Sequence, residues 1–125
     1  MKQRIFTQDQ LDRAVIEEFV VGVQVNFNFF YSSISNRLEL LGTDTRRQTN
    51  IEGIGKLPAS YQQDVLRYVP LKYEEAGHIA VTVLESILED AFALGERFVV
   101  ATKKLFKPGI IGPFALQSII TAGPP

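Results

Sequence analysis

Few side chains in this sequence have the types and spacing that enzyme chemistry requires. The 125 residues include one His, at position 78, and no Cys. The absence of Cys excludes disulfides, thiolate zinc sites and cysteine nucleophiles, and a single His excludes a His-rich metal cluster. Phosphate-binding loops, dinucleotide-binding fingerprints, nucleophile elbows and zinc motifs are also absent from the sequence. Any chemistry must therefore come from carboxylates, amides, arginines or the backbone.

The most unusual polar pair is Glu17 and Glu18, which interrupt an apolar run over residues 15–21. The run predicts a strand that ends in a turn or bulge at Gly22. Two adjacent carboxylates inside an apolar strand need partners or water for at least one of them. We therefore predict that this strand lies at an edge.

Other polar residues have simpler structural explanations. Arg46 and Arg47 could bind phosphate by forked donation, but neighbours in a strand point to opposite faces, which favours a solvated surface. For His78, composition alone favours an exposed or hydrogen-bonded residue over a ligand. Three carboxylates lie near the start of a predicted helix: Glu85, Glu89 and Asp90. They are explained as favourable charges at the helix N-terminus.

The clearest strand covers residues 23–29, where apolar side chains alternate strictly with polar ones. This period of two predicts one buried face and one polar face, and the polar face carries amides: Gln24, Asn26 and Asn28. The nearby aromatic residues could stack on bases, but their alternation and the lack of interleaved Lys or Arg favour core packing: Phe27, Phe29, Phe30 and Tyr31.

The remaining pattern predicts an α+β fold. An apolar repeat at three and four residue steps predicts a long helix over 84–106, stopped by Pro108 and Gly109. Capping-box spacing predicts short helices over 8–14 and 60–66. Strands are expected over 37–41, 78–83 and 114–120, so that 15–48 forms an antiparallel meander, and the last strand should leave an open edge. The segment 67–77 is left unassigned.

Composition limits the partners. The net charge of −1 gives no general attraction to nucleic acid. No apolar run approaches the roughly 18 residues of a membrane span, and no signal-peptide core follows the first residues. A cytoplasmic protein with neither nucleic acid nor membrane as a partner is expected.

Six segments together resemble one family, and the most specific is Pro108-Gly-Ile-Ile-Gly-Pro-Phe114. The others are 15–22, 29–32, 37–42, 49–53 and 95–99. They resemble the archaeal formate-dependent ligase of purine biosynthesis. This ATP-grasp enzyme joins formate to the amino group of aminoimidazole carboxamide ribonucleotide, using ATP. The segments follow the family order across almost the whole chain. The resemblance implies that residues 1–125 form one partial, C-terminal ATP-grasp domain.

The resemblance also implies site residues and cofactors, ATP and Mg²⁺. The backbone carbonyl of Glu18 and amide of Val20 would read adenine, with Phe19 as apolar packing. Gln48 stands where the family has a Glu in the nucleotide site. His78 replaces an Asn that contacts the ribonucleotide. For the metal, Gln117 occupies the position of a magnesium ligand, where an amide oxygen is weaker than a carboxylate.

Parts of the ligase are missing from the matching segment. The phosphate-binding lysines and glycine-rich loop should precede it, and a strand with a second magnesium ligand should follow it. The resemblance therefore implies a truncated homologue that is inactive alone and has no catalytic residues of its own. The alternatives are one half of a split ligase, completed by a separate chain, and a non-catalytic nucleotide-binding or protein-interaction module. An unrelated α+β interaction domain is the remaining alternative.

Exposed apolar surface on such a domain should find a partner. We predict a homo-oligomer, with a symmetric dimer as the expected form. The expected contact elements are residues 110–120 and the strand 23–29.

Overall fold

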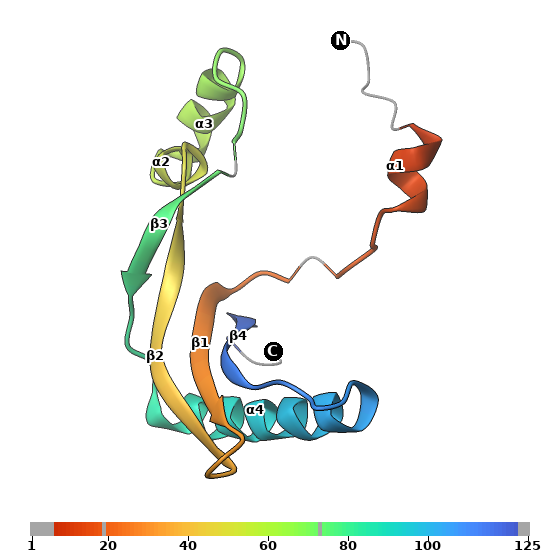
Figure 1. Cartoon of the computed structure of the whole chain (residues 1–125). Coiled ribbons are helices and arrows are strands. Elements are labelled where there is room, and N and C mark those ends of the chain that lie inside the picture. The colour runs from red at the N-terminus through yellow and green to blue at the C-terminus, as the bar shows by residue number, and fades with distance from the viewer. Residues whose placement is uncertain (1–6, 19, 73, 123–125) are drawn as a thin grey trace.

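The chain forms one antiparallel sheet with a long helix against it (Figure 1). The computed structural model describes residues 7–18, 20–72 and 74–122. Its four strands lie in the order β3-β2-β1-β4, and the long helix is α4. The α+β class is therefore confirmed. In chain order the elements are α1 (Gln8–Asp12), β1 (Val23–Ser32), β2 (Arg37–Gln48), α2 (Ile51–Gly55), α3 (Ala59–Leu66), β3 (Glu75–Ala80), α4 (Glu85–Leu105) and β4 (Gly112–Ile120).

The core lies between β1 and α4. Val25, Phe27 and Phe29 alternate along β1 and are buried against Ala91 of the helix. Phe29 is completely buried, and its ring lies 5.4 Å from that of Phe92. The apolar face of β1 and the apolar face of α4 thus meet at one interface, which confirms core packing for Phe27 and Phe29. Phe30 faces the other side of the sheet and is 37% exposed, so the core packing predicted for this residue is wrong.

A one-residue bulge in β2 divides that strand into two parts. Phe29 pairs with Leu40, whereas Asn28 pairs with Gly42, so Leu41 has no partner on β1. Because side chains alternate along a strand, one extra residue exchanges the two faces. Leu38 and Leu40 pack against the core. After Leu41, the even-numbered residues of β2 instead lie beside the amides of β1.

A second bulge occurs where β2 meets β3. Arg47 pairs with Gly77, but Gln48 pairs with Glu75, so Ala76 is left over. His78 and Glu75, three residues apart, would otherwise point to opposite faces of a strand. The bulge places them on the same face.

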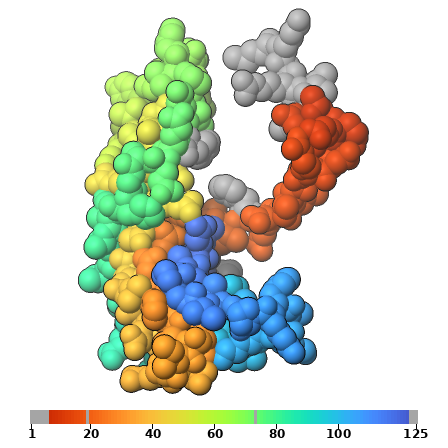
Figure 2. All heavy atoms as spheres, viewed as in Figure 1, coloured from red at the N-terminus to blue at the C-terminus, as the bar shows by residue number. Residues whose placement is uncertain are grey.

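The strand expected over residues 15–21 is not formed. This segment has no regular secondary structure in its described part, and Ile16 is 99% exposed. Glu17 and Glu18 are exposed as well. None of the strands in the described ranges lies beside the segment to pair with it. In the space-filling view α1 and the residues after it stand apart from the sheet (Figure 2).

The shorter elements were predicted with mixed success. The capping box of Thr7 and Gln10 is present at α1, which ends at Asp12. The helix at 60–66 is confirmed as α3, but Pro58 is its N-cap and Ser60 does not cap it. The strand expected at 78–83 instead spans Glu75–Ala80, and α2 was not predicted.

The strand order decides which of the two expected contact elements, residues 23–29 and 110–120, has a free strand edge in the described sheet. β1 lies between β2 and β4, so its edges are occupied. β4 is an outer strand of the described sheet, with β1 on one side of it. Its other side is the open edge that was predicted for the last strand. None of the helices in the described ranges is both long and apolar enough to cross a membrane.

Gly22 permits the close approach of β1 to β4. A Cβ at this position would clash with the backbone carbonyl oxygen of Ile120. We expect Gly22→Ala to lower the free energy of unfolding by about 1–3 kcal/mol, because backbone cannot yield as a side chain can. Gly55→Ala is the control, since a Cβ there meets open space, and it should be neutral or slightly stabilising. Urea unfolding of both variants tests this; equal midpoints would contradict it.

Candidate functional site

Polar side chains from all four strands share the face of the sheet opposite α4. Their positions follow from the strand register. Asn26 of β1 pairs with Asp44 of β2 on one side and with Gln117 of β4 on the other. Arg46 of β2 pairs with His78 of β3. We call this surface the polar face; its residues are Asn26, Asn28, Asp44, Arg46, Gln48, Glu75, His78 and Gln117.

Asp44 lies at the centre of the polar face. Its Oδ1 accepts from Asn26 Nδ2 at 2.8 Å and lies 2.7 Å from His78 Nδ1. Its Oδ2 accepts from Asn28 Nδ2 at 2.5 Å. The hydrogen bond with His78, followed by that with Asn26, lowers the pKa of Asp44 from its ordinary 3.8 to about 2. The carboxylate is therefore ionised over the whole physiological range.

His78 is held between two carboxylates. Its Nε2 lies 2.6 Å from Glu75 Oε1, on the side of the ring away from Asp44. An imidazolium donates from both nitrogens, so the protonated form fits this arrangement best. The hydrogen bond to Asp44, and then that to Glu75, raises the pKa of His78 above its ordinary value. Arg46 Nε lies 3.2 Å from Glu75 Oε2, so two cations and two anions balance within the cluster.

Two buried polar atoms in this cluster make no hydrogen bond. They are Asn26 Oδ1 and Arg46 Nε. Arg46 Nε is close enough to Glu75 for ionic attraction, although the N–H is not aligned for a hydrogen bond. Asn26 Oδ1 has no such compensation. A buried acceptor without a donor costs about 1–3 kcal/mol, and Asn26 Oδ1 has no accessible surface through which a bound molecule could satisfy it.

The sequence-predicted site residues fall into two groups. His78 and Gln117 lie on the polar face, where Gln117 is exposed opposite Asn26. Gln48 lies at the end of β2, and its backbone N–H donates to Glu52 Oε1 at 2.9 Å. This bond lowers the pKa of the Glu52 carboxyl.

The other group belongs to the segment before β1. Glu18 is exposed and Val20 is half-buried, while Phe19 lies outside the described residues. A cavity of about 500 Å³ connects this segment to the polar face, and its lining includes Glu17, Gln24 and Gln117. Glu17 and Gly22, on either side of the predicted adenine-reading residues, therefore border the same hollow as Gln117, whereas Glu18 and Val20 are not among its lining residues.

The described side chains do not fit a magnesium centre. Mg²⁺ in proteins is held by carboxylate oxygens and by substrate phosphates. Gln117 supplies only an amide oxygen. No group of three or more acidic or His side chains in the described ranges is arranged to hold a metal ion.

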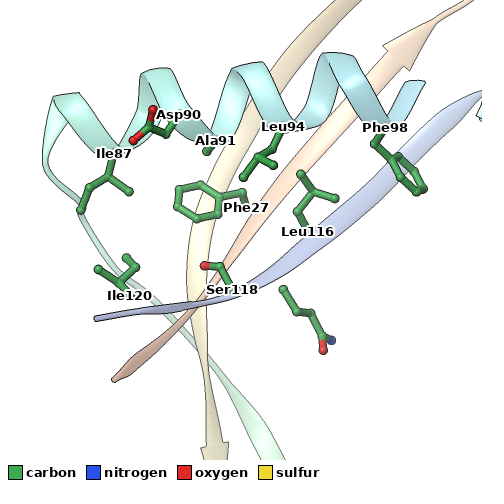
Figure 3. Close-up of a pocket in the computed structure, with 10 residues that line it drawn as sticks. Phe27, Ile87, Asp90, Ala91, Leu94, Phe98, Leu116, Ser118 and Ile120 are labelled. Carbon is green, nitrogen blue, oxygen red and sulfur yellow. The ribbon is translucent and has the colours of Figure 1, made fainter. Parts of the chain in front are cut away.

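A separate apolar cavity lies on the α4 side of the sheet. Its volume is about 370 Å³, and its walls come from α4, β1 and β4 (Figure 3). Figure 3 shows Phe27, Leu94 and Leu116 around it. Most of its lining is apolar; the exceptions include Asp90 and Ser118, and the Ser118 hydroxyl donates to the carbonyl oxygen of Val25 at 2.8 Å.

The polar network of Asn26, Asn28, Asp44 and Glu75 was not predicted. The alternation of β1 did place the two Asn side chains on one polar face. Nothing local connects Asp44 with His78, which lies 34 residues further along. The link depends on two bulges whose positions the sequence pattern does not indicate.

Comparisons with known proteins identify the family of this chain. Residues 1–123 match a family described as a domain of unknown function, DUF1297. Two curated relatives are named 5-formaminoimidazole-4-carboxamide-1-(beta)-D-ribofuranosyl 5'-monophosphate synthetase. The one from Sulfurisphaera tokodaii is 42% identical over 89% of this chain and 32% of its own length. The one from Methanocaldococcus jannaschii is 39% identical over 94% of this chain and 32% of its own length.

A solved structure is also similar. It is the crystal structure of an IMP biosynthesis protein, PurP, from Thermococcus kodakaraensis, with a TM-score of 0.66 and 38% identity. The match covers 79% of this chain and 30% of that one. The chain thus spans about a third of the length of the relatives that it matches, and its fold is part of an ATP-grasp lobe. It belongs to the DUF1297 family, as a homologue of one portion of the formaminoimidazole carboxamide ribonucleotide synthetases of IMP biosynthesis.

Proposed function

We propose that this chain forms one wall of a nucleotide site in a ligase that formylates aminoimidazole carboxamide ribonucleotide with formate and ATP. The polar face would contact the ribonucleotide, and the segment before β1 would contact adenine. The observation that carries the proposal is the polar face itself. It is an ordered surface of amides around the ionised carboxylate of Asp44, with the ion-paired side chains of Arg46, Glu75 and His78 beside them.

The chemistry of the surface suits a ribonucleotide. Amide oxygens accept from amino, carboxamide and hydroxyl groups, all of which an aminoimidazole carboxamide ribonucleotide carries. His78, positively charged when it donates to both neighbouring carboxylates, is the substrate-side residue implied by the family resemblance. It orients Asp44 and Glu75 and leaves the face without excess charge.

The adenine contact is supported by the state of the backbone. Residues 15–18 and 20–22 form no strand and have no backbone hydrogen bond to the described part of the chain. Extended backbone offers alternating N–H and carbonyl groups, which can pair with the edge of a purine. Glu18 and Val20 are the residues proposed for this contact, and Gln48 would reach the nucleotide from β2.

This chain would bind and orient rather than catalyse. No described residue is placed as a nucleophile, and no phosphate-gripping lysine lies on the polar face. Phosphoryl transfer depends on neutralising phosphate charge. ATP, when bound, would supply the activated phosphate, and the residues named here would hold the two nucleotides near each other. A separate chain that carries the remaining lobe is proposed as the catalytic partner.

Nuclear magnetic resonance of the ¹⁵N-labelled 125-residue chain tests this proposal. Titration with aminoimidazole carboxamide ribonucleotide should shift the side-chain amide signals of Asn26 and Asn28, and ATP should shift backbone signals near Val20. Gln117→Ala should weaken the response to the ribonucleotide severalfold. Gln63→Ala, an exposed amide on α3, is the matched control and should change nothing. Unshifted signals at millimolar concentrations of both ligands would contradict the proposal.

A further inference from the structure

The outer edge of β4 carries backbone groups that no neighbouring strand pairs with. In the part of the chain that the structure describes, β4 pairs with β1 alone. The carbonyl oxygen of Ile120 lies against Gly22, on the β1 side. Because backbone groups alternate between the two edges of a strand, even-numbered residues of β4 bond to β1 and odd-numbered ones face outward. Three residues thus present both an N–H and a carbonyl at the free edge: Ala115, Gln117 and Ile119.

Pro113 agrees with this orientation and limits the edge. It pairs with Phe30 of β1 although a proline has no N–H. A proline is accommodated in a paired strand where its nitrogen faces away from the neighbouring strand. Its position is odd-numbered, as the orientation of Ile120 requires. Since Pro113 cannot donate at the outer edge either, full pairing there begins at Ala115.

The outer edge of β4 lacks the charges that usually protect a free strand. Natural proteins discourage pairing at such an edge with charged side chains, proline or a bulge. The other outer strand, β3, is protected in this way, because Glu75 and His78 lie on it in ion pairs. β4 contains no Asp, Glu, Lys or Arg, and its proline lies near one end. The remainder of this edge is open to pairing.

The sequence of β4 is complementary to itself. Antiparallel pairing about a two-fold axis at Gln117 opposes this residue to its own copy and opposes Ala115 to Ile119. All three outward residues then exchange both hydrogen bonds, because Ala115 and Ile119 are equidistant from the axis. An axis one residue earlier, at Leu116, would instead oppose Ile119 to Pro113 and lose one bond in each copy.

The same axis brings apolar side chains together on the α4 side of the sheet. Phe114 of one copy would lie opposite Ile120 of the other, an aromatic and β-branched pair of the kind that stabilises sheets. Leu94 and Phe98 of α4, which line the apolar cavity beside β4, are 49% and 39% exposed. Figure 3 shows them near Leu116. A second copy would extend the sheet next to this apolar surface and reduce its contact with water.

We infer that the outer edge of β4 binds a second copy of this chain, with the two-fold axis at Gln117. The four strands of each copy then form one continuous sheet. A symmetric interface of this kind uses the same surface twice. The inference goes beyond the proposed function and does not depend on it, because it uses the backbone of β4 rather than the side chains of the polar face.

Sedimentation equilibrium of the full chain tests the inference. The wild type should have a mass near twice 14.0 kDa at micromolar concentrations. Gln117→Lys places two ammonium groups opposite each other at the axis. It should raise the dissociation constant of the dimer about fivefold at low salt, with partial recovery at high salt. Gln63→Lys, the same change at an exposed position of α3, is the control and should leave the mass unchanged.

Cross-linking determines the register, because the chain has no Cys of its own. Opposed residues of a hydrogen-bonded antiparallel pair have Cα atoms about 5.5 Å apart, within the range that a disulfide spans. Gln117→Cys should therefore form a covalent dimer on mild oxidation. In Ala115→Cys the two thiols would be about 14 Å apart along the strand and should not link. A monomeric wild type, a Gln117→Lys dimer as tight as the wild type, or equal cross-linking of the two Cys variants would each overturn the inference.

Discussion

Replacing Phe29 by alanine is expected to lower the free energy of unfolding by about 3–5 kcal/mol. Phe29 is completely buried at the centre of the core, between the ring of Phe92 at 5.4 Å and that of Phe114 at 5.6 Å. Removing the ring leaves a cavity that strands fixed on both sides of β1 cannot close. Domains of this size have total stabilities of about 5–15 kcal/mol, so the variant should lose a large part of its stability and unfold at a markedly lower temperature than the wild type. Thermal unfolding followed by circular dichroism measures the effect.

Phe30→Ala is the matched control for this prediction. It makes the same chemical change at the next residue of the same strand, on the opposite face, where the side chain is 37% exposed. A loss of about 1 kcal/mol or less is expected. Similar losses at both positions would show that the helix-covered face is not the main core.

The second prediction is a pH dependence of stability that belongs to the pair of Asp44 and His78. The pKa of Asp44 is depressed to about 2. Its contribution is therefore present above its unfolded pKa, near 4, and is lost as the pH falls toward 2; it amounts to about 2 kcal/mol. The pKa of His78 is raised. The stability from His78 is thus complete below its unfolded value, about 6.5, and is lost as the pH rises through the folded one.

The stability difference between wild type and Asp44→Asn should consequently be largest between about pH 4 and pH 6.5. It should decline on both sides of that window. His78→Asn isolates the two limbs, because without the imidazole the alkaline decline should disappear while an acid decline remains. Urea unfolding at a series of pH values provides the data. A difference that does not vary with pH would show that the pair is not coupled to folding.

The sequence predicted those parts of the fold whose pattern is local. β1 and α4 have strict periods. The ends of each element lie within a few residues of the predicted ends. The prediction failed at residues 15–21, because β-branched apolar residues form a strand only when another strand lies beside them. Val15 is 80% exposed, and the described sheet ends before reaching it. β3 was misplaced because Ala76 and Gly77 carry no alternation.

The candidate site was predicted in part for the same reason. The polar side of β1 was evident from its amides, and His78 and Gln117 were identified only through the family resemblance. The contacts that join these residues depend on the pairing of strands distant in the sequence. Asp44 gave no local signal, since an Asp flanked by threonines in a polar run is typical of a surface. Its role follows from what lies across the strand from it.

The bulge at Leu41 has a consequence for how this sheet can change in length. Even-numbered residues of β2 face the core over 37–40 but face the polar side over 42–48, because the bulge at Leu41 exchanges the two faces. Substituting Leu41 alters only a side chain that is 62% exposed. Deleting Leu41 would remove the bulge, so that the side chains alternate without interruption along β2. Either Leu40 would then face solvent or Asp44 would face the core. At this point of the chain, selection should therefore preserve the number of residues more strictly than their identity.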